Sequence, residues 1–220
     1  MRSHFLFILI LLLPCVVIGQ KIKGGLALGL NATQVDGDEV YGFHKLGLNA
    51  GAFAIVPFGK HFSASLETSY SQKGSYQRPV YLDSINGEYK LILNYVEVPV
   101  LFQYADKDIV KVGAGFSWAR LVDFKEWQNS TRMNWSTPYG PYKTSDTDVL
   151  IDLQLKIITG FYFNLRYSYS MGKIRTRTFH NITGTWTRKQ FNNDLAFRIV
   201  YVFKDTPSAR VKNKNTDKIK

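Results

Sequence analysis

Residues 61–72 read HFSASLETSYSQ, and in this stretch apolar and polar side chains alternate almost without a break. Phe62, Leu66 and Tyr70 fall on one side of an extended chain, while Glu67 falls on the other side among serines. Successive side chains of a β-strand point to opposite faces, so this period of two predicts a strand with one apolar and one polar face.

The same period recurs along most of the chain. Residues 149–157 and 161–171 repeat it, with apolar faces that open at Val149 and Phe161. No segment after residue 20 has a helical period. We therefore predict eight strands, at residues 21–32, 44–58, 61–73, 89–104, 109–122, 148–158, 161–172 and 190–203.

The connections between these strands alternate in length. Tight turns at 59–60, 105–108 and 159–160 alternate with long connections at 33–43, 74–88, 123–147 and 173–189. Transmembrane barrels are built this way, with short turns in the periplasm and long loops outside. An even strand number also puts both chain ends on the periplasmic side. The predicted fold class is therefore all-β: an eight-stranded antiparallel up-and-down transmembrane β-barrel.

Aromatic residues on the apolar faces gather at two levels. Those near the predicted periplasmic ends are Phe58, Phe62, Phe102, Tyr104, Phe161, Tyr201 and Phe203, and those near the other ends are Tyr70, Trp118, Tyr169 and Phe191. Lipid-facing barrel surfaces carry such a girdle at each interface. Alternation alone leaves open a soluble sandwich, or a lipocalin-like ligand-binding barrel with an apolar inside.

The N-terminus has the layout of an export signal. Arg2 precedes the apolar run from Phe5 to Leu13, and Gly19 is a small residue suited to a cleavage site. The run is too short to span a membrane as a helix, and Cys15 would be removed with it. We expect a signal peptide at 1–19, an outer-membrane β-barrel at 20–204 and a polar, basic periplasmic tail at 205–220, in a bacterial outer membrane.

The chain is basic, with a formal net charge of +11, and 15% of its residues are aromatic. This composition excludes fibrous and disordered classes. An exported protein rarely meets nucleic acid in a specific role, so we expect no nucleic-acid partner. Outer-membrane lipid and lipopolysaccharide, which are negatively charged, are the expected partners for the excess base, with an envelope protein as a further candidate.

Residues 95–101, YVEVPVL, resemble a motif of the PorT-like outer-membrane β-barrel family of Bacteroidota-type bacteria. The flanking segments 70–74 and 112–115 and the final strand ending at Phe203 are similar to that family as well. The resemblance implies the barrel fold and the membrane, and a possible accessory role in protein secretion, as for the founding member. It implies no chemistry, and the polar tail after Phe203 departs from barrels that end at the terminal aromatic.

If the apolar faces meet lipid, eight charged side chains point into the lumen: Glu67, Glu97, Lys111, Asp152, Lys156, Arg166, Asp194 and Arg198. Four acids and four bases predict a paired network that closes the lumen, because a selective pore favours one sign. Glu67 and Glu97 could form an acid–base pair. The lumen of an eight-stranded barrel has little room for a substrate, so we expect Arg166 or Arg198 to bridge these two carboxylates instead.

We expect no enzyme, no metal and no cofactor. The mature chain contains only His44, His61 and His180, and neither a Gly-x-Ser-x-Gly elbow nor a metal-spaced histidine pair accompanies them.

The predicted extracellular loops carry opposite charges. The loop at 33–43 is acidic, with Asp36, Asp38 and Glu39, and its neighbour at 173–189 carries five bases without an acid: Lys173, Arg175, Arg177, Arg188 and Lys189. Either the two loops only screen each other, or the excess base binds an anionic partner. Five aromatic residues would supply contact area for a sugar or a protein edge: Trp127, Trp135, Tyr139, Tyr142 and Trp186.

The function that these features favour is an integral outer-membrane platform for structure or interaction, a class that includes an accessory role in protein secretion or envelope biogenesis. The alternatives are a narrow porin for small solutes and the soluble lipocalin-like barrel.

Overall fold

The computed structural model describes residues 22–78, 87–106 and 109–205. The predicted signal peptide at 1–19 lies outside the described residues, as does the predicted tail after Asp205. No helix in the described part is long and apolar enough to cross a membrane.

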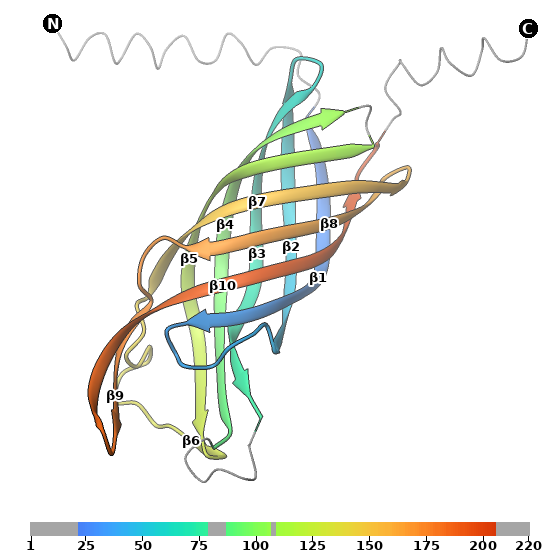
Figure 1. The fold of residues 1–220 in the computed structure, drawn as a ribbon. Coiled ribbons are helices and arrows are strands. Elements are labelled where there is room, and N and C mark those ends of the chain that lie inside the picture. The colour runs from blue at the N-terminus through green and yellow to red at the C-terminus, as the bar shows by residue number, and fades with distance from the viewer. Residues whose placement is uncertain (1–21, 79–86, 107–108, 206–220) are drawn as a thin grey trace, which may run out of the picture.

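Eight long antiparallel strands form a closed ring (Figure 1). The ring closes because β1 pairs with β10, from Gly25 opposite Val202 to Asp36 opposite Phe191. The ring strands are β1 (Lys23–Asp36), β2 (Lys45–Phe58), β3 (Phe62–Gln77), β4 (Tyr89–Asp106), β5 (Val110–Gln128), β7 (Ser145–Ile158), β8 (Phe161–Ser170) and β10 (Gly184–Val202). The predicted fold class is confirmed.

Several strands extend beyond their predicted ends on the side of the long connections. β5 reaches Gln128 and carries the two-residue β6 (Thr131–Arg132) at its tip. The segment predicted as a loop at 173–189 is mostly a hairpin, in which β9 (Arg175–Asn181) pairs with the first half of β10. In β5 the alternation is broken at Val122 and Asp123, opposite a register shift in β4, and β9 is almost entirely polar, so neither segment carries an unbroken apolar–polar period.

The two ends of the barrel differ as predicted. The short turn between β2 and β3 lies at the same end as Lys23 and Asp205, while β6 and β9 project from the other end (Figure 1). Gly59 and Gly160 each adopt a φ of 85° in tight turns, a left-handed conformation that glycine adopts without steric strain.

Over the middle of the ring the outer surface is apolar, while the inside is polar. Outward-facing side chains that are well exposed include Leu28, Leu46, Leu66, Phe116, Ile151 and Phe197. Inward-facing Glu67, Asp152 and Arg198 are each at most 3% exposed. A lipocalin-like barrel has the opposite distribution, so the soluble alternative is wrong.

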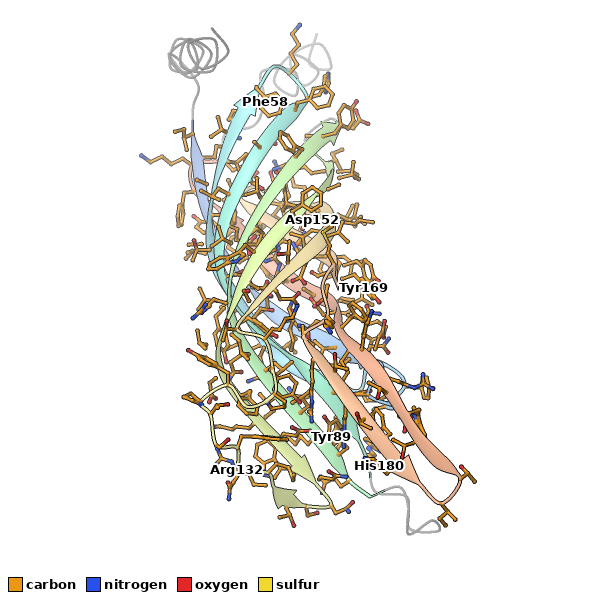
Figure 2. All side chains as sticks on the ribbon, turned by 90° about the vertical axis from the view of Figure 1, so that its left-hand side faces the viewer. Phe58, Tyr89, Arg132, Asp152, Tyr169 and His180 are labelled. Carbon is orange, nitrogen blue, oxygen red and sulfur yellow. The ribbon has the colours of Figure 1, made fainter. Side chains whose placement is uncertain are left out.

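Aromatic rings pack on the outer surface near both ends. At the turn end, Phe58 and Phe62 lie 6.3 Å apart, and Phe161 and Tyr201 lie 4.8 Å apart, between ring centroids. Toward the other end, Tyr169 and Phe191 lie 6.2 Å apart. Figure 2 shows Phe58 and Tyr169 at these different heights.

Side chains fill the inside of the barrel in layers. The turn end holds a small cluster of Ala27, Tyr162, Val200 and Val202, against which Phe53 packs. Charged residues occupy the middle. The half nearer the long connections contains an apolar cluster of Val35, Val40, Tyr89, Leu91, Leu93, Tyr95, Ala119, Leu121, Phe124, Tyr142 and Ile174.

Candidate functional site

Two arginines share one carboxylate in the middle of the lumen. Arg166 Nη2 lies 2.9 Å from Glu67 Oε2, and Arg198 Nη1 lies 2.6 Å from Glu67 Oε1. Arg166 Nε also lies 2.8 Å from Asp152 Oδ1. The expectation that an arginine bridges Glu67 and Glu97 is wrong, because both guanidinium groups lie between Glu67 and Asp152.

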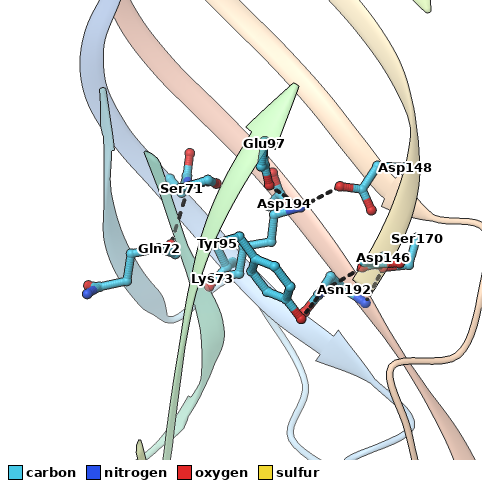
Figure 3. A network of polar contacts seen from close by, with 12 residues as sticks. Ser71, Gln72, Lys73, Tyr95, Glu97, Asp146, Asp148, Ser170, Asn192 and Asp194 are labelled. Atoms are coloured by element: carbon cyan, nitrogen blue, oxygen red, sulfur yellow. Dashed lines mark hydrogen bonds and ion pairs between the residues drawn. The ribbon is translucent and has the colours of Figure 1, made fainter. Parts of the chain in front are cut away.

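Glu97 belongs to a second cluster, which centres on Lys73 (Figure 3). The Lys73 ammonium lies 2.6 Å from Asp148 Oδ2, 2.9 Å from Glu97 Oε1 and 3.2 Å from Asp194 Oδ1. These four side chains come from β3, β4, β7 and β10. A single lysine therefore links strands around most of the ring.

Asp146 extends this second cluster toward the long connections. Asn192 Nδ2 donates to Asp146 Oδ2 at 2.9 Å and to the Tyr95 hydroxyl at 3.3 Å, and Ser170 also donates to Asp146 (Figure 3). Sequence reasoning missed Lys73, Asp146 and Asp148. Lys73 sits at the predicted end of its strand, and both aspartates lie at or beyond the predicted edge of theirs.

With these residues included, the predicted balance of four acids and four bases is wrong. Among the described residues, three buried cations occupy the mid-lumen: Lys73, Arg166 and Arg198. Six buried carboxylates face them: Glu67, Glu97, Asp146, Asp148, Asp152 and Asp194. The excess of acid lies entirely around Lys73, because the other cluster pairs two arginines with two carboxylates.

The remaining two predicted lumen bases lie at the turn end of the barrel. Lys111 Nζ lies 4.3 Å from the centre of the Tyr162 ring, and Lys156 Nζ lies 3.2 Å from Asp205 Oδ2. Lys23 pairs with the other oxygen of Asp205 at 3.2 Å.

Asp205, which we assigned to the tail, therefore packs on the barrel. Partial burial favours the neutral acid, but hydrogen bonds from Tyr162, Lys23 and Lys156 outweigh it and lower the pKa of Asp205 to about 2. Asp205 thus stays ionised and fastens the end of β10 to β1 and β7.

At the opposite end, the basic segment is partly structural. Arg175 is buried, with Nη1 2.9 Å from Glu126 Oε1 and 2.7 Å from the Tyr142 hydroxyl. Tyr89 donates to the same Glu126 oxygen at 3.1 Å. The interpretation of Arg175 as an exposed loop cation is wrong, because the extension of β5 brings Glu126 beneath it.

The other four bases of this segment are less enclosed. Half-buried Arg177 lies over the Phe179 ring, and Arg188 Nε lies 3.7 Å from Glu39 Oε1. Lys173 and Lys189 are exposed. Trp186 Nε1 donates to Glu39 at 2.7 Å, so the acidic loop and the basic hairpin are in direct contact.

The five predicted contact aromatics fall into different environments. Tyr142 is a core residue at 4% exposure, so its assignment as a surface contact is wrong. Tyr139 packs against the same cluster. The centre of the Trp127 ring lies 5.5 Å from Lys90 Nζ, and the centre of the Trp135 ring lies 5.5 Å from the Arg175 guanidinium carbon. Trp135 is 37% exposed. Trp186 stacks on Phe179.

Two of the described histidines lie at opposite ends of the barrel. His61 lies at the turn between β2 and β3, whereas His180 lies on the hairpin at the far end (Figure 2). In the part of the chain that the structure describes, no group of three or more His, Cys, Asp or Glu side chains is arranged to hold a metal ion.

The acidic loop at 37–44 is held by its own side chains. Asp38 Oδ1 accepts from the Val40 amide at 2.8 Å, and Val40 is buried in the apolar cluster. Gln34 Oε1 accepts from the Gly42 amide at 3.0 Å. Burial raises the pKa of Asp38 to about 6 against the opposing effects of Ser75, the Val40 amide and Arg177.

A family model described as "Outer membrane protein beta-barrel domain" matches residues 19–175. No curated protein sequence matches the chain.

Three of the solved structures that match the chain are distant in sequence. Neisserial surface protein A is 11% identical, with a TM-score of 0.48, over 83% of this chain and 98% of that one. Ail of Yersinia pestis, determined in a phospholipid nanodisc, is 13% identical, with a TM-score of 0.44, over 83% and 100%. The outer membrane protein AlkL, determined in lipid bilayers, is 12% identical, with a TM-score of 0.39, over 83% and 91%.

The Lys73 cluster yields a stability prediction. Lys73→Met should destabilise the barrel by about 3–5 kcal/mol, because it leaves buried carboxylates without their cation. The measurement is urea unfolding in lipid vesicles, monitored through the difference in gel mobility between unheated and boiled samples. Lys189→Met, at an exposed lysine, is the control and should change stability by less than about 0.5 kcal/mol. Equal unfolding midpoints for the two variants would contradict the structural role of Lys73.

Asp38 yields a pH prediction. Between about pH 4 and pH 6 the folded loop binds a proton that the unfolded chain does not, so the loop becomes more stable as the pH falls. Stability should change by up to about 1.4 kcal/mol per pH unit there. Hydrogen exchange of the amides at 37–44, corrected for intrinsic rates, should therefore slow from pH 7.5 to pH 5. Asp38→Asn should remove this dependence, and a loop that loosens at pH 5 would refute the assignment.

Proposed function

The chain belongs to the family of outer membrane protein beta-barrel domains, and from this membership we propose that it is a closed, non-enzymatic platform in the bacterial outer membrane. Its barrel provides rigidity, and its extracellular rim carries recognition.

One observation carries this proposal: side chains fill the lumen at three successive levels. The Asp205 contacts and the Tyr162 cluster occupy the turn end, the ion pairs of Glu67 and Lys73 occupy the middle, and the apolar cluster occupies the outer half. An eight-stranded barrel is just wide enough for side chains to fill its inside. A solute would have to displace several buried ion pairs, so a porin is the weaker alternative.

The exposed part of the hairpin supports an interaction role. Lys173, Arg188 and Lys189 are exposed beyond the ring, and Arg188 is only partly neutralised by Glu39 at 3.7 Å. Clustered cations of this kind attract anionic surfaces. We propose that the hairpin contacts lipopolysaccharide or an anionic envelope protein, and that an accessory role in secretion or envelope biogenesis would act through this contact.

From the closed lumen we predict that the protein does not conduct ions. The refolded protein, inserted into a planar bilayer, should give no stable single-channel steps above the level of a protein-free bilayer, because ions would have to displace the buried ion pairs and apolar side chains that fill the described interior. Insertion is verified separately by protease protection and gel mobility. Large, reproducible conductance steps would overturn the platform and favour the porin.

The hairpin predicts a charge-dependent contact. Lys173→Glu, Arg188→Glu and Lys189→Glu together should weaken binding to purified lipopolysaccharide by about tenfold or more, and salt should reduce wild-type binding. Arg175 is left unchanged, because its reversal would break the buried pair with Glu126. Lys60→Glu, at the exposed periplasmic turn, is the control. If the triple variant binds as well as this control, the hairpin is only a solvated edge.

A further inference from the structure

A cleft of about 550 Å³ opens at the rim of the barrel, between the loop at 37–44 and the end of β3. The described residues that line it are Glu39, Val40, Tyr41, His44, Tyr76, Gln77 and Arg78. None of these seven residues was assigned a role above except Glu39 and Val40, which hold the loop in place. The volume lies within the range of small-ligand sites.

The loop presents one aromatic ring to this cleft. Tyr41 is 81% exposed, although its two neighbours are anchored. Val40 is buried in the apolar cluster, and the Gly42 amide donates to Gln34. A large exposed ring between two fixed residues loses little conformational freedom when it binds something, which favours affinity.

The position of the cleft excludes a lipid tail as the occupant. Tyr76 lies six residues beyond Tyr70, which marks the outer aromatic level on β3. At about 3.3 Å per residue, this is roughly 20 Å further along the strand. The cleft therefore faces water outside the membrane.

The lining combines groups that suit a sugar. The faces of the Tyr41 and Tyr76 rings carry partial negative charge, and the C–H face of a pyranose ring packs on such a surface. Gln77 and His44 offer donors and acceptors to hydroxyl groups. Among the described residues Arg78 makes no ion pair, and a guanidinium binds a carboxylate with two parallel hydrogen bonds.

Glu39 opposes an acid in this cleft only in part. Its carboxylate accepts from Trp186 at 2.7 Å and lies 3.7 Å from Arg188, so part of its negative charge is offset from the hairpin side. We propose that the cleft binds a glycan with an acidic sugar, its ring against Tyr41 and its carboxylate against Arg78. This proposal rests on the platform function only in that the cleft must face the outside.

The test is calorimetric titration of the full-length protein in lipid nanodiscs. The probes are three trisaccharides that end in glucuronate, galacturonate or N-acetylneuraminate, with neutral maltotriose and the peptide Glu-Glu-Glu as comparisons. The wild type should bind at least one acidic trisaccharide and bind maltotriose and the peptide more weakly. Tyr41→Ala and Arg78→Gln should each weaken that binding by about tenfold.

Arg132→Gln is the matched control. Arg132 lines a separate rim cleft of about 230 Å³, so its substitution should leave the affinity for the trisaccharide unchanged. The proposal is overturned if no acidic trisaccharide binds, if maltotriose or the peptide binds as tightly, or if Arg132→Gln loses as much affinity as Arg78→Gln. Gel mobility verifies that each variant is folded. If the protein conducts no ions in planar bilayers but binds no acidic trisaccharide, only the proposal for the cleft is refuted. If it binds the trisaccharide but conducts ions, only the closed platform is refuted.

Discussion

The carboxylate of Glu67, shared by Arg166 and Arg198, is the contact on which the closed lumen depends. Three buried charges from β3, β8 and β10 meet there, with Asp152 of β7 as the fourth. Desolvating such groups is expensive, and each is stable only because the others satisfy it. Asp152 and Arg166 already face each other across the β7–β8 hairpin, whereas Glu67 comes from β3, 99 residues before Arg166. Because β3 pairs with neither β8 nor β10, the full contact forms only when the sheet has curved into the closed ring.

The sequence predicted strands well where lipid imposes two different faces, and less well elsewhere. Between Phe62 and Tyr70 the outer face of β3 contacts hydrocarbon and its inner face contacts charged side chains, so apolar and polar residues alternate clearly along the strand. In the outer part of β5 the inner face is apolar and the outer face is exposed, but the alternation breaks at Val122 and Asp123. β9 is almost entirely polar, so both segments went unpredicted. The ion pairs could not be predicted from the sequence either. Strand tilt and register decide that Glu97 pairs with Lys73 and not with Arg166.

Arg175 illustrates why a residue's chemistry did not reveal its role. A run of bases without an acid looked like a free cationic loop, but the compensating acid, Glu126, comes from a strand 49 residues earlier. Arg188 and Lys189, only a few residues along the paired strand, stay exposed. The hairpin thus divides into an inner end that closes the barrel and an outer end that is available for contact.

Glu39 connects the two outer surfaces. It lines the rim cleft and, from the same carboxylate, accepts from Trp186 and pairs with Arg188 on the hairpin. Residues that share a partner do not act additively, so removing Arg188 changes the charge inside the cleft as well as on the hairpin. An anion bound to the hairpin would compete with Glu39 for Arg188. The negative charge of Glu39 would then no longer be offset, and it would repel an acidic ligand in the cleft. The two surfaces should therefore oppose each other when both meet acidic ligands, and the coupling must be reciprocal.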